Sequence, residues 1–260
     1  MTLRSLAQAL IIGVFGLTGC QRQRSAVHFR PTGSNKFTDV TIVPSAPQPV
    51  ERLPRIAGNK MLWHGVPVGL MVHYAFDVPL ARLIIHQPPE LYDIDASFNS
   101  STTEDDIKEM IRSLLITHFA LRSHRETRDT EFLNLGSSGA KSKLKTAVTF
   151  APLDIRGEKI QTNEICDCRF ADEGRVAGSG VTVQQIADVV SDIVSRPVVD
   201  GTGLTGRYVV DVPYAYGAKP ATSPALPTID IALQKTLGLR LEGDFGPVDM
   251  MIVDHVERLQ

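Results

Sequence analysis

The sequence predicts an α+β fold, with antiparallel sheets and helices packed on one face of them. Strand-like runs of β-branched or alternating residues recur along the chain, and the apolar spacing becomes helical in three places. A helix–strand–strand order begins near Thr103, Thr182 and Thr228, so we expect the fold to be built from such units. The composition, 43% hydrophobic and 22% charged over 260 residues, is typical of a globular protein.

The N-terminus carries a targeting signal. Arg4 precedes an apolar stretch over residues 6–15, and Leu17-Thr18-Gly19-Cys20 matches the bacterial lipobox. We therefore expect residues 1–19 to be a lipoprotein signal peptide and Cys20 to carry acyl chains, such as palmitate, that hold the protein at a membrane. Gln21 favours the outer membrane, facing the periplasm, by resemblance to the common sorting pattern. A short transmembrane anchor is the alternative.

The rest of the chain divides into a tether and two folded regions. Residues 20–36 are polar and basic without periodicity, which predicts a tether. We expect an N-terminal α+β region over residues 37–150 and a C-terminal α+β region over residues 151–260. The C-terminal region would hold two helix–strand–strand units. Beyond the signal peptide, no apolar run reaches the roughly 18 residues of a transmembrane helix.

The first elements of the N-terminal region are short. Residues 37–43 are rich in β-branched side chains and predict a strand, which the following prolines end in a loop. Residues 56–62 predict a second strand, and residues 66–76 predict a helix with Pro67 in its first turn. Residues 92–98 alternate between apolar and polar, which predicts a half-buried strand with Asp93 and Asp95 on its solvated face.

The strongest helix signal follows Thr102-Thr103-Glu104-Asp105-Asp106, a capping sequence that also places acids at the helix N-terminus. Apolar residues then recur at helical spacing, namely Ile107, Met110, Ile111, Leu114, Leu115 and Phe119. Residues 119–127 and 130–135 predict two strands, joined by a tight turn near Arg128-Asp129.

The C-terminal region begins with a strand over residues 165–170. A capping box of Thr182 with Gln185 then starts a helix that Pro197 ends. Residues 198–199 and 208–212 predict partner strands. Thr228 caps a short helix that Gly238 ends, and a strand at residues 239–241, a turn at 243–247 and a strand at 248–256 follow.

One motif resembles a nucleotide loop. Gly201-Thr202-Gly203-Leu204-Thr205-Gly206 satisfies GxGxxG, but a dinucleotide fingerprint needs a helix directly after it. A β-rich run over residues 207–212 follows instead, so we expect the glycines to supply positive φ in a strand connection. No cofactor is predicted. The sequence lacks HExxH, GxSxG and P-loop motifs, so no catalytic or metal-binding residues are predicted.

Two cysteines remain once Cys20 is assigned to the lipid. Cys166 and Cys168 would share one face of an extended strand, with about 6 to 7 Å between their Cα atoms. We regard them as a candidate disulfide that needs a local kink. Unpaired structural thiols, pairing with another chain and a metal site are alternatives. The seven histidines, His28, His64, His73, His86, His118, His124 and His255, are interpreted as structural or surface residues.

Several segments together carry a family resemblance. They are residues 92–96, the helix over residues 110–119 followed by 124–128, the runs 181–187, 196–200 and 202–208, and the ending over residues 246–257. The chain resembles a secreted family of unknown function that is expanded in acidobacteria and other soil bacteria, from about residue 37 to the C-terminus. The resemblance implies no catalytic residues. The chain departs from the family pattern at Cys166-Asp167-Cys168, at Gly201 and in its lipobox.

The functional hypothesis follows from the targeting signal and the net charge of the chain. The formal net charge of −2 gives no basic field, so nucleic acid is not an expected partner. The last unit is similar to small periplasmic modules of secretins and TonB-dependent receptors, which suggests docking by analogy. We expect a lipid-anchored envelope protein that binds a protein, peptide or surface polymer. The alternative is an envelope hydrolase or redox protein that uses His and Asp residues or Cys166 and Cys168.

Overall fold

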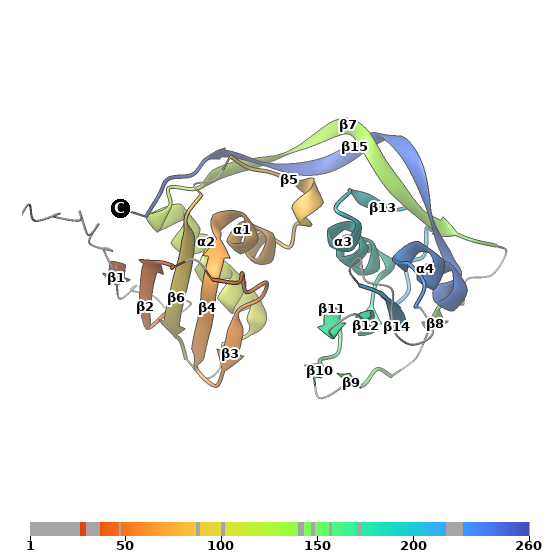
Figure 1. The fold of residues 1–260 in the computed structure, drawn as a ribbon, viewed down its shortest axis with the longest axis horizontal. Helices are drawn as coiled ribbons and strands as arrows, with labels where there is room; N and C mark the ends of the chain where they lie inside the picture. The colour runs from red at the N-terminus through yellow and green to blue at the C-terminus, as the bar shows by residue number, and fades with distance from the viewer. Residues whose placement is uncertain are drawn as a thin grey trace, which may run out of the picture.

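Helices and strands of this chain form two lobes under a long two-stranded ribbon (Figure 1). The computed structural model describes residues 27–29, 37–46, 48–86, 89–99, 102–139, 143–146, 149–155, 158–170, 173–216 and 226–259. Helices and largely antiparallel strands are both abundant, so the expected α+β class is confirmed.

The first lobe, which we call the N-lobe, has a sheet in the order β1–β2–β6–β4–β3, antiparallel throughout. Its central strand alternates as predicted, with Tyr92, Ile94 and Ala96 buried, because successive side chains point to opposite faces. The strands are β1 (Val27–Phe29), β2 (Asp39–Pro44), β3 (Arg55–Ala57), β4 (Lys60–Pro67) and β6 (Leu91–Ser97).

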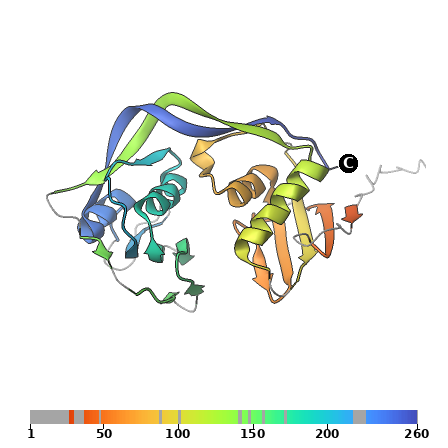
Figure 2. The ribbon, with the colours of Figure 1, turned by 180° about the vertical axis from the view of Figure 1, so that it is seen from behind.

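Two helices cover one face of this sheet, α1 (Val68–Phe76) and α2 (Glu104–His118) (Figure 2). The predicted cap of α2 is confirmed. The Thr103 hydroxyl accepts from the Asp106 N–H, and the Asp106 carboxylate accepts from the Thr103 N–H in return. The apolar stripe of α2 is buried against the sheet and α1, and this packing builds the N-lobe core.

The second lobe, the C-lobe, has an antiparallel sheet in the order β11–β12–β14–β8. Two helices contribute to its core, α3 (Val183–Val194), which starts at the predicted Thr182–Gln185 capping box, and α4 (Ile229–Leu237). The strands are β8 (Lys145–Thr146), β11 (Ile165–Phe170), β12 (Glu173–Val181) and β14 (Tyr208–Ala215), with a separate pair of β9 (Leu153–Ile155) and β10 (Glu158–Ile160).

The ribbon consists of β7 (Arg122–Ser137) and β15 (Leu239–His255), which pair antiparallel along almost their whole length. Short strands extend it at both edges. β13 (Val198–Asp200) runs parallel to β7, and β5 (Leu83–Ile84) runs parallel to β15 after the short helix η1 (Leu80–Arg82). This sheet is therefore mixed, and the expectation of purely antiparallel sheets is wrong here.

Two turns expected from the sequence do not form. Arg128 and Asp129 lie within β7 opposite Val248 and Pro247, and residues 243–247 lie within β15. The two turn signals face each other across the ribbon, so the ladder on either side keeps both segments extended, and long-range pairing overrides local preference. As a result α2 and α4 are each followed by one long strand, and the helix–strand–strand units expected near Thr103 and Thr228 are wrong.

The ribbon links the two cores. Leu135 of β7 and Leu239 of β15 are buried in the C-lobe core, whereas Met251 and Val253 of β15 are buried in the N-lobe core. The ribbon therefore pairs β7, from the expected region of residues 37–150, with β15, from the expected region of residues 151–260. Within the expected tether, β1 pairs with β2.

Candidate functional site

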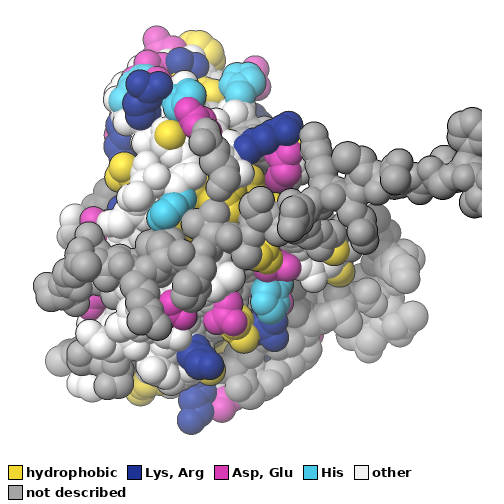
Figure 3. Space-filling view, turned by 90° about the vertical axis from the view of Figure 1, so that its left-hand side faces the viewer, with side chains coloured by type: hydrophobic (Ala, Val, Ile, Leu, Met, Phe, Trp, Pro, Cys, Tyr) yellow, Lys and Arg dark blue, Asp and Glu magenta, His cyan; other side chains and the backbone are white. Residues whose placement is uncertain are grey.

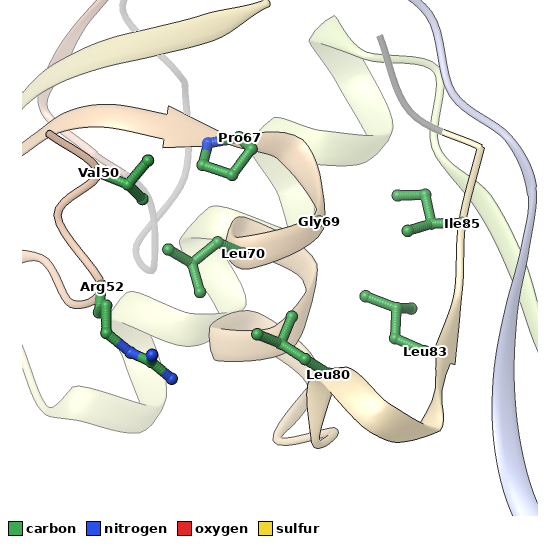
Figure 4. Close-up of a pocket in the computed structure, with 8 residues that line it drawn as sticks. All are labelled: Val50, Arg52, Pro67, Gly69, Leu70, Leu80, Leu83 and Ile85. Atoms are coloured by element: carbon green, nitrogen blue, oxygen red, sulfur yellow. The ribbon is translucent and has the colours of Figure 1, made fainter. Parts of the chain in front are cut away.

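An apolar cavity opens at the first turn of α1, between residues 48–54 on one side and η1 with β5 on the other (Figure 4). Its volume is about 370 Å³, which is within the range of ligand pockets. The lining includes two exposed apolar residues, Val50 at 47% and Leu80 at 39% relative exposure. The complete lining is Val50, Arg52, Pro67, Gly69, Leu70, Leu80, Leu83 and Ile85.

The wall formed by residues 48–54 is held by hydrogen bonds to β4 and β6. The Trp63 indole N–H donates to the Glu51 carbonyl at 2.8 Å, and the Glu51 carboxylate accepts from the His64 N–H at 3.0 Å. Asp93, predicted to lie on a solvated face, accepts from the Gly65 N–H and from the Gln48 side chain, each at 2.8 Å. This carboxylate therefore has a structural role in fixing the cavity wall.

Gly65 is required where this wall meets β4. Its φ is 62°, in the left-handed region that favours glycine. A Cβ atom there would meet the Gln48 side chain and the Pro49 carbonyl oxygen at 3.0 Å, so the wall approaches β4 as closely as a glycine allows.

The opposite wall is set by the turn after α1. Asp77 adopts a left-handed conformation that ends the helix, and the His73 ring contacts the Val78 carbonyl through Nδ1 at 2.7 Å. In the strand that follows, Leu83 and Ile85 face the cavity, while Ile84 between them packs against the apolar cluster of the ribbon. This alternation is the period of an extended strand.

Positive charge is concentrated at the mouth of the cavity. Arg52 is exposed and forms no hydrogen bond or ion pair with the residues that the structure describes. The N-cap of α1 is Pro67, whose own side chain makes no capping hydrogen bond, and the first turn of the helix holds no acidic residue. The positive end of the helix dipole therefore adds to the Arg52 charge.

The cavity adjoins the junction where the lobes meet. Asp192 of α3 accepts from the Leu80 N–H at 2.7 Å, and its second oxygen lies 3.7 Å from His73 Nε2. Arg82 lies 3.8 Å from Asp188 of α3 and donates to the Val198 carbonyl. These contacts join α1 and η1 to α3 and β13 at the floor between the lobes.

Burial is the largest influence on the pKa values of the two junction acids, Asp192 and Asp188. It raises the pKa of the Asp192 carboxyl, while His73, the Leu80 N–H and Arg52 act in the opposite direction. Burial also raises the pKa of Asp188, and the Gln184 side chain and Arg82 lower it. Desolvation is the largest cause for both, because their charged forms lose hydration when the lobes meet.

Two further histidines, His124 and His255, form ion pairs away from the cavity. His124 on β7 contacts Asp254 at 2.9 Å and Glu126 at 3.3 Å, and these hydrogen bonds raise its pKa. His255 pairs with Glu257 at 2.9 Å. Figure 3 shows histidines beside charges of both signs at the upper edge of the N-lobe end. These exposed ion pairs agree with a surface role, because solvent screens such contacts and leaves them weak.

The cysteines do not share a site with the histidines. Cys166 and Cys168 lie on β11 in the C-lobe, with Cα atoms 5.3 Å apart and their sulfur atoms in bonding contact. They pack against the β9–β10 pair through a small apolar cluster. Among the described residues no group of three or more His, Cys, Asp and Glu side chains could hold a metal. The two cysteines therefore lie apart from the contact between His73 and Asp192 at the junction.

The glycine motif forms a loop between β13 and β14, with no helix after it. Gly203 has a φ of 68° as expected, but Gly201 and Gly206 do not have positive φ. At Gly201 an added Cβ would lie 2.0 Å from Asn134 Oδ1, so this glycine serves close packing against β7.

Some of the cavity residues carry no helix or strand signal in the sequence. Val50, Arg52 and Leu80 lie in segments without apolar periodicity. The available signal was the presence of apolar side chains in a proline-rich loop, since such residues are exposed unless they pack. Cys20, residues 1–19 and most of the expected tether lie outside the described residues. In the part that is described, no helix combines the length and apolarity that crossing a membrane requires.

The C-lobe, the ribbon, the junction and the part of the N-lobe from Leu70 onward fall within one family match. A family model described as protein of unknown function, DUF3738, matches residues 70–256. The chain belongs to this family. No curated protein and no solved structure matches the chain.

The DUF3738 match begins at Leu70, within α1. It includes one wall of the cavity, with Leu80, Leu83 and Ile85, and both acids of the junction. The other wall, with Val50 and Arg52, lies before the matched range. The cavity is thus built where the DUF3738 domain meets the strands that precede it.

Proposed function

We propose that this protein is a lipid-anchored binding or docking module of the cell envelope, whose ligand or partner occupies the cavity at α1. The observation that carries the proposal is the apolar cavity with Val50 and Leu80 exposed at its mouth. A contiguous apolar surface left open to solvent is typical of a binding site.

The walls of the cavity favour binding. Both are held by hydrogen bonds within the chain, from Trp63 and Gly65 on one side and from Leu80 on the other. A ligand therefore meets a preformed site, and little conformational entropy is lost when it binds. Burial of the exposed parts of Val50 and Leu80 then contributes directly to affinity.

Photo-crosslinking in the native envelope tests the binding role. A photoreactive phenylalanine analogue is placed at Val50 or at Leu80, and the matched control carries it at Ile231, a 42% exposed residue of α4. We expect defined adducts from the two cavity positions that the Ile231 position does not give. The same adducts from all three positions would mean that the cavity has no special role.

The lipid anchor at Cys20 forms part of the proposal, with the outer membrane facing the periplasm as its place. It is supported by Leu17-Thr18-Gly19-Cys20 and by Gln21. Cys20→Ala removes the thiol that carries the acyl chains. We expect the variant to be released into a soluble fraction or to accumulate as the uncleaved precursor, measured by fractionation and intact mass. A variant that is processed and anchored like the parent would show that the anchor is not at Cys20.

We propose Cys166 and Cys168 as a disulfide in this oxidising compartment. The contact of their sulfur atoms and the Cα separation of 5.3 Å support it. Peptide mapping without reductant should recover both cysteines in one fragment that is lighter by two hydrogens and resists alkylation. Alkylation of both thiols before reduction would exclude the bond.

A further inference from the structure

We infer that the lobe junction is a proton-dependent latch, in which one proton shared by His73 and Asp192 holds the two lobes together and its loss lets them separate. The inference concerns the junction and goes beyond the binding role proposed for the cavity. It is carried by the geometry of the His73–Asp192 contact, by the polar character of the junction and by the ribbon that spans it.

The contacts of His73 fix the place of one of its ring protons. Its Nδ1 lies 2.7 Å from the Val78 carbonyl oxygen. A carbonyl oxygen only accepts hydrogen bonds, so Nδ1 must carry hydrogen. The proton that the ring gains or loses is therefore on Nε2, the atom that lies 3.7 Å from an Asp192 carboxylate oxygen.

The contact between His73 and Asp192 requires a proton. With the proton on Nε2, an imidazolium faces a carboxylate, and with the proton on Asp192, a carboxyl O–H faces the Nε2 lone pair. Without it, a lone pair faces a negative charge between two side chains that are only 22% and 13% exposed. Such a buried and uncompensated charge is costly, so the deprotonated pair favours separation.

Asp192 also joins the lobes through the backbone. Its other carboxylate oxygen accepts from the Leu80 N–H at 2.7 Å, which fixes the side chain at the junction. Leu80 also lines the cavity at α1. The position of this cavity wall therefore depends on the same proton.

The surrounding charges act in the same net direction. They are Asp77 at the end of α1, Arg52 in the loop before β3, Arg82 in η1, Asp188 in α3 and Asp167 in β11. Arg52 lowers the pKa of Asp192 and Asp167 raises it, but burial is the largest cause and raises it. A carboxyl whose pKa is raised in the closed junction stabilises closure at low pH and loses this contribution as the pH rises through that pKa.

The remainder of the structure permits the lobes to move. Among the described residues, α1 belongs to the N-lobe core and α3 to the C-lobe core, and the two cores share no residue. Arg82 adds polar contacts to Asp188 and to the Val198 carbonyl. β7 and β15 run over both lobes and keep them joined when these contacts break (Figure 1). Polar contacts of this kind within a chain commonly allow relative motion.

Two measurements on the full mature chain test the latch at about pH 5 and about pH 8, the range in which imidazole groups change charge. Hydrogen exchange of the Leu80 amide reports the contact with Asp192. Energy transfer reports the distance between the lobes, with fluorophores on azide-bearing residues at two exposed positions, Ile116 of α2 and Ile231 of α4. At the higher pH we expect the protection factor of Leu80, corrected for intrinsic exchange, to fall by about tenfold or more. The transfer efficiency should fall with it, at unchanged far-UV circular dichroism.

Substitutions at Asp192 separate the proton from the side chain. Asp192→Asn supplies an amide that accepts from the Leu80 N–H and donates to Nε2 of His73, so the junction should stay closed at the higher pH. Asp192→Ala removes both contacts and should be open at both pH values. Asp211→Asn, at an acid that pairs with Arg175 within the C-lobe, is the matched control and should respond to pH like the parent.

The outcomes decide the inference. A Leu80 protection factor and a transfer efficiency that stay the same at both pH values in the parent would overturn the latch. So would an Asp192→Asn protein that opens at the higher pH. If Leu80 protection falls while the transfer efficiency is constant, the proton acts on this contact alone and lobe separation is wrong. Loss of both signals in the parent and in Asp211→Asn, with retention in Asp192→Asn, supports the latch.

Discussion

The helices α1 and α3 belong to opposite sides of the lobe junction, and they begin in opposite ways. The N-terminus of α3 is closed by the Thr182–Gln185 capping box. The N-cap residue of α1 is Pro67, whose own side chain makes no capping hydrogen bond, and this helix begins beside an apolar cavity that Arg52 also lines. The helix start at the candidate site therefore lacks the reciprocal capping box that begins α3.

The two lobes also differ in how their apolar residues are covered. The fully buried core of the C-lobe is covered by its own helices and by the ribbon. The N-lobe core is larger and includes the only tryptophan, yet its edge at α1 and β5 leaves Val50 and Leu80 exposed. The proposed binding cavity thus lies in the N-lobe, and the C-lobe contacts its rim where Asp192 of α3 accepts from the Leu80 N–H.

The largest expected effect tests whether the two lobes are one cooperative unit. Leu115→Ala in α2 and Leu233→Ala in α4 each remove a fully buried side chain, one from each core. Each should cost about 2 to 5 kcal/mol of unfolding free energy. Because β7 and β15 run through both cores, we expect one urea transition, with Trp63 emission and far-UV circular dichroism changing together. A Leu233→Ala protein that loses dichroism while Trp63 emission stays native would show that the lobes unfold separately.

A smaller effect distinguishes the cavity wall from a loop of the C-lobe. Gly65 and Gly203 have similar φ values, 62° and 68°, but only Gly65 is crowded, while Gly203 has open space. Gly203→Ala should cost about 1 to 2 kcal/mol for the left-handed conformation alone. Gly65→Ala should cost more, because the Pro49 backbone must also move. Thermal melts of both variants measure the loss, and equal losses of stability would count against a tightly held wall.

The smallest effect compares an acid at the junction with an acid at a helix cap. The folded pKa of Asp192 is raised by burial, so its contribution to stability is present at low pH and is lost as the pH rises through that pKa. The folded pKa of Asp106 is lowered by its hydrogen bonds with Thr103, so its contribution is present at higher pH and is lost as the pH falls. Asp192→Asn should therefore gain stability relative to the parent as pH rises, and Asp106→Asn should lose it.

Melting temperatures from about pH 3 to pH 7 measure these two slopes, since this range covers the ordinary titration of carboxyl groups. The parent protein is the reference at each pH. Slopes of the same sign for both variants would show that Asp192 is not destabilised by its burial between the lobes.

Much of the fold could be predicted where the deciding contacts are local. The capping boxes at Thr103 and Thr182 and the helix stop at Gly238 were predicted and are confirmed. The inward side of β6 was also predicted, because alternation along one strand is enough to define it. Such features depend on residues a few positions apart, so the sequence contains the whole signal.

The ribbon and the cavity could not be predicted in this way. The turn signals at Arg128-Asp129 and at residues 243–247 are genuine local preferences, but each lies opposite the other in β7 and β15. The cavity combines Val50 and Arg52 from a loop, Leu70 from a helix and Leu83 from a short edge strand. No local pattern joins these residues.

The sequence by itself determined the α+β class and the caps and apolar faces of α2 and α3, because these follow from residue types within a few turns of chain. Tertiary structure alone decided that β7 and β15 are continuous, and that Leu80 meets Asp192 across 112 residues of sequence. It also decided that Arg52 lies at an apolar cavity. Pairing and packing between distant segments set these features, since their energy exceeds the local turn and loop preferences that the sequence displays.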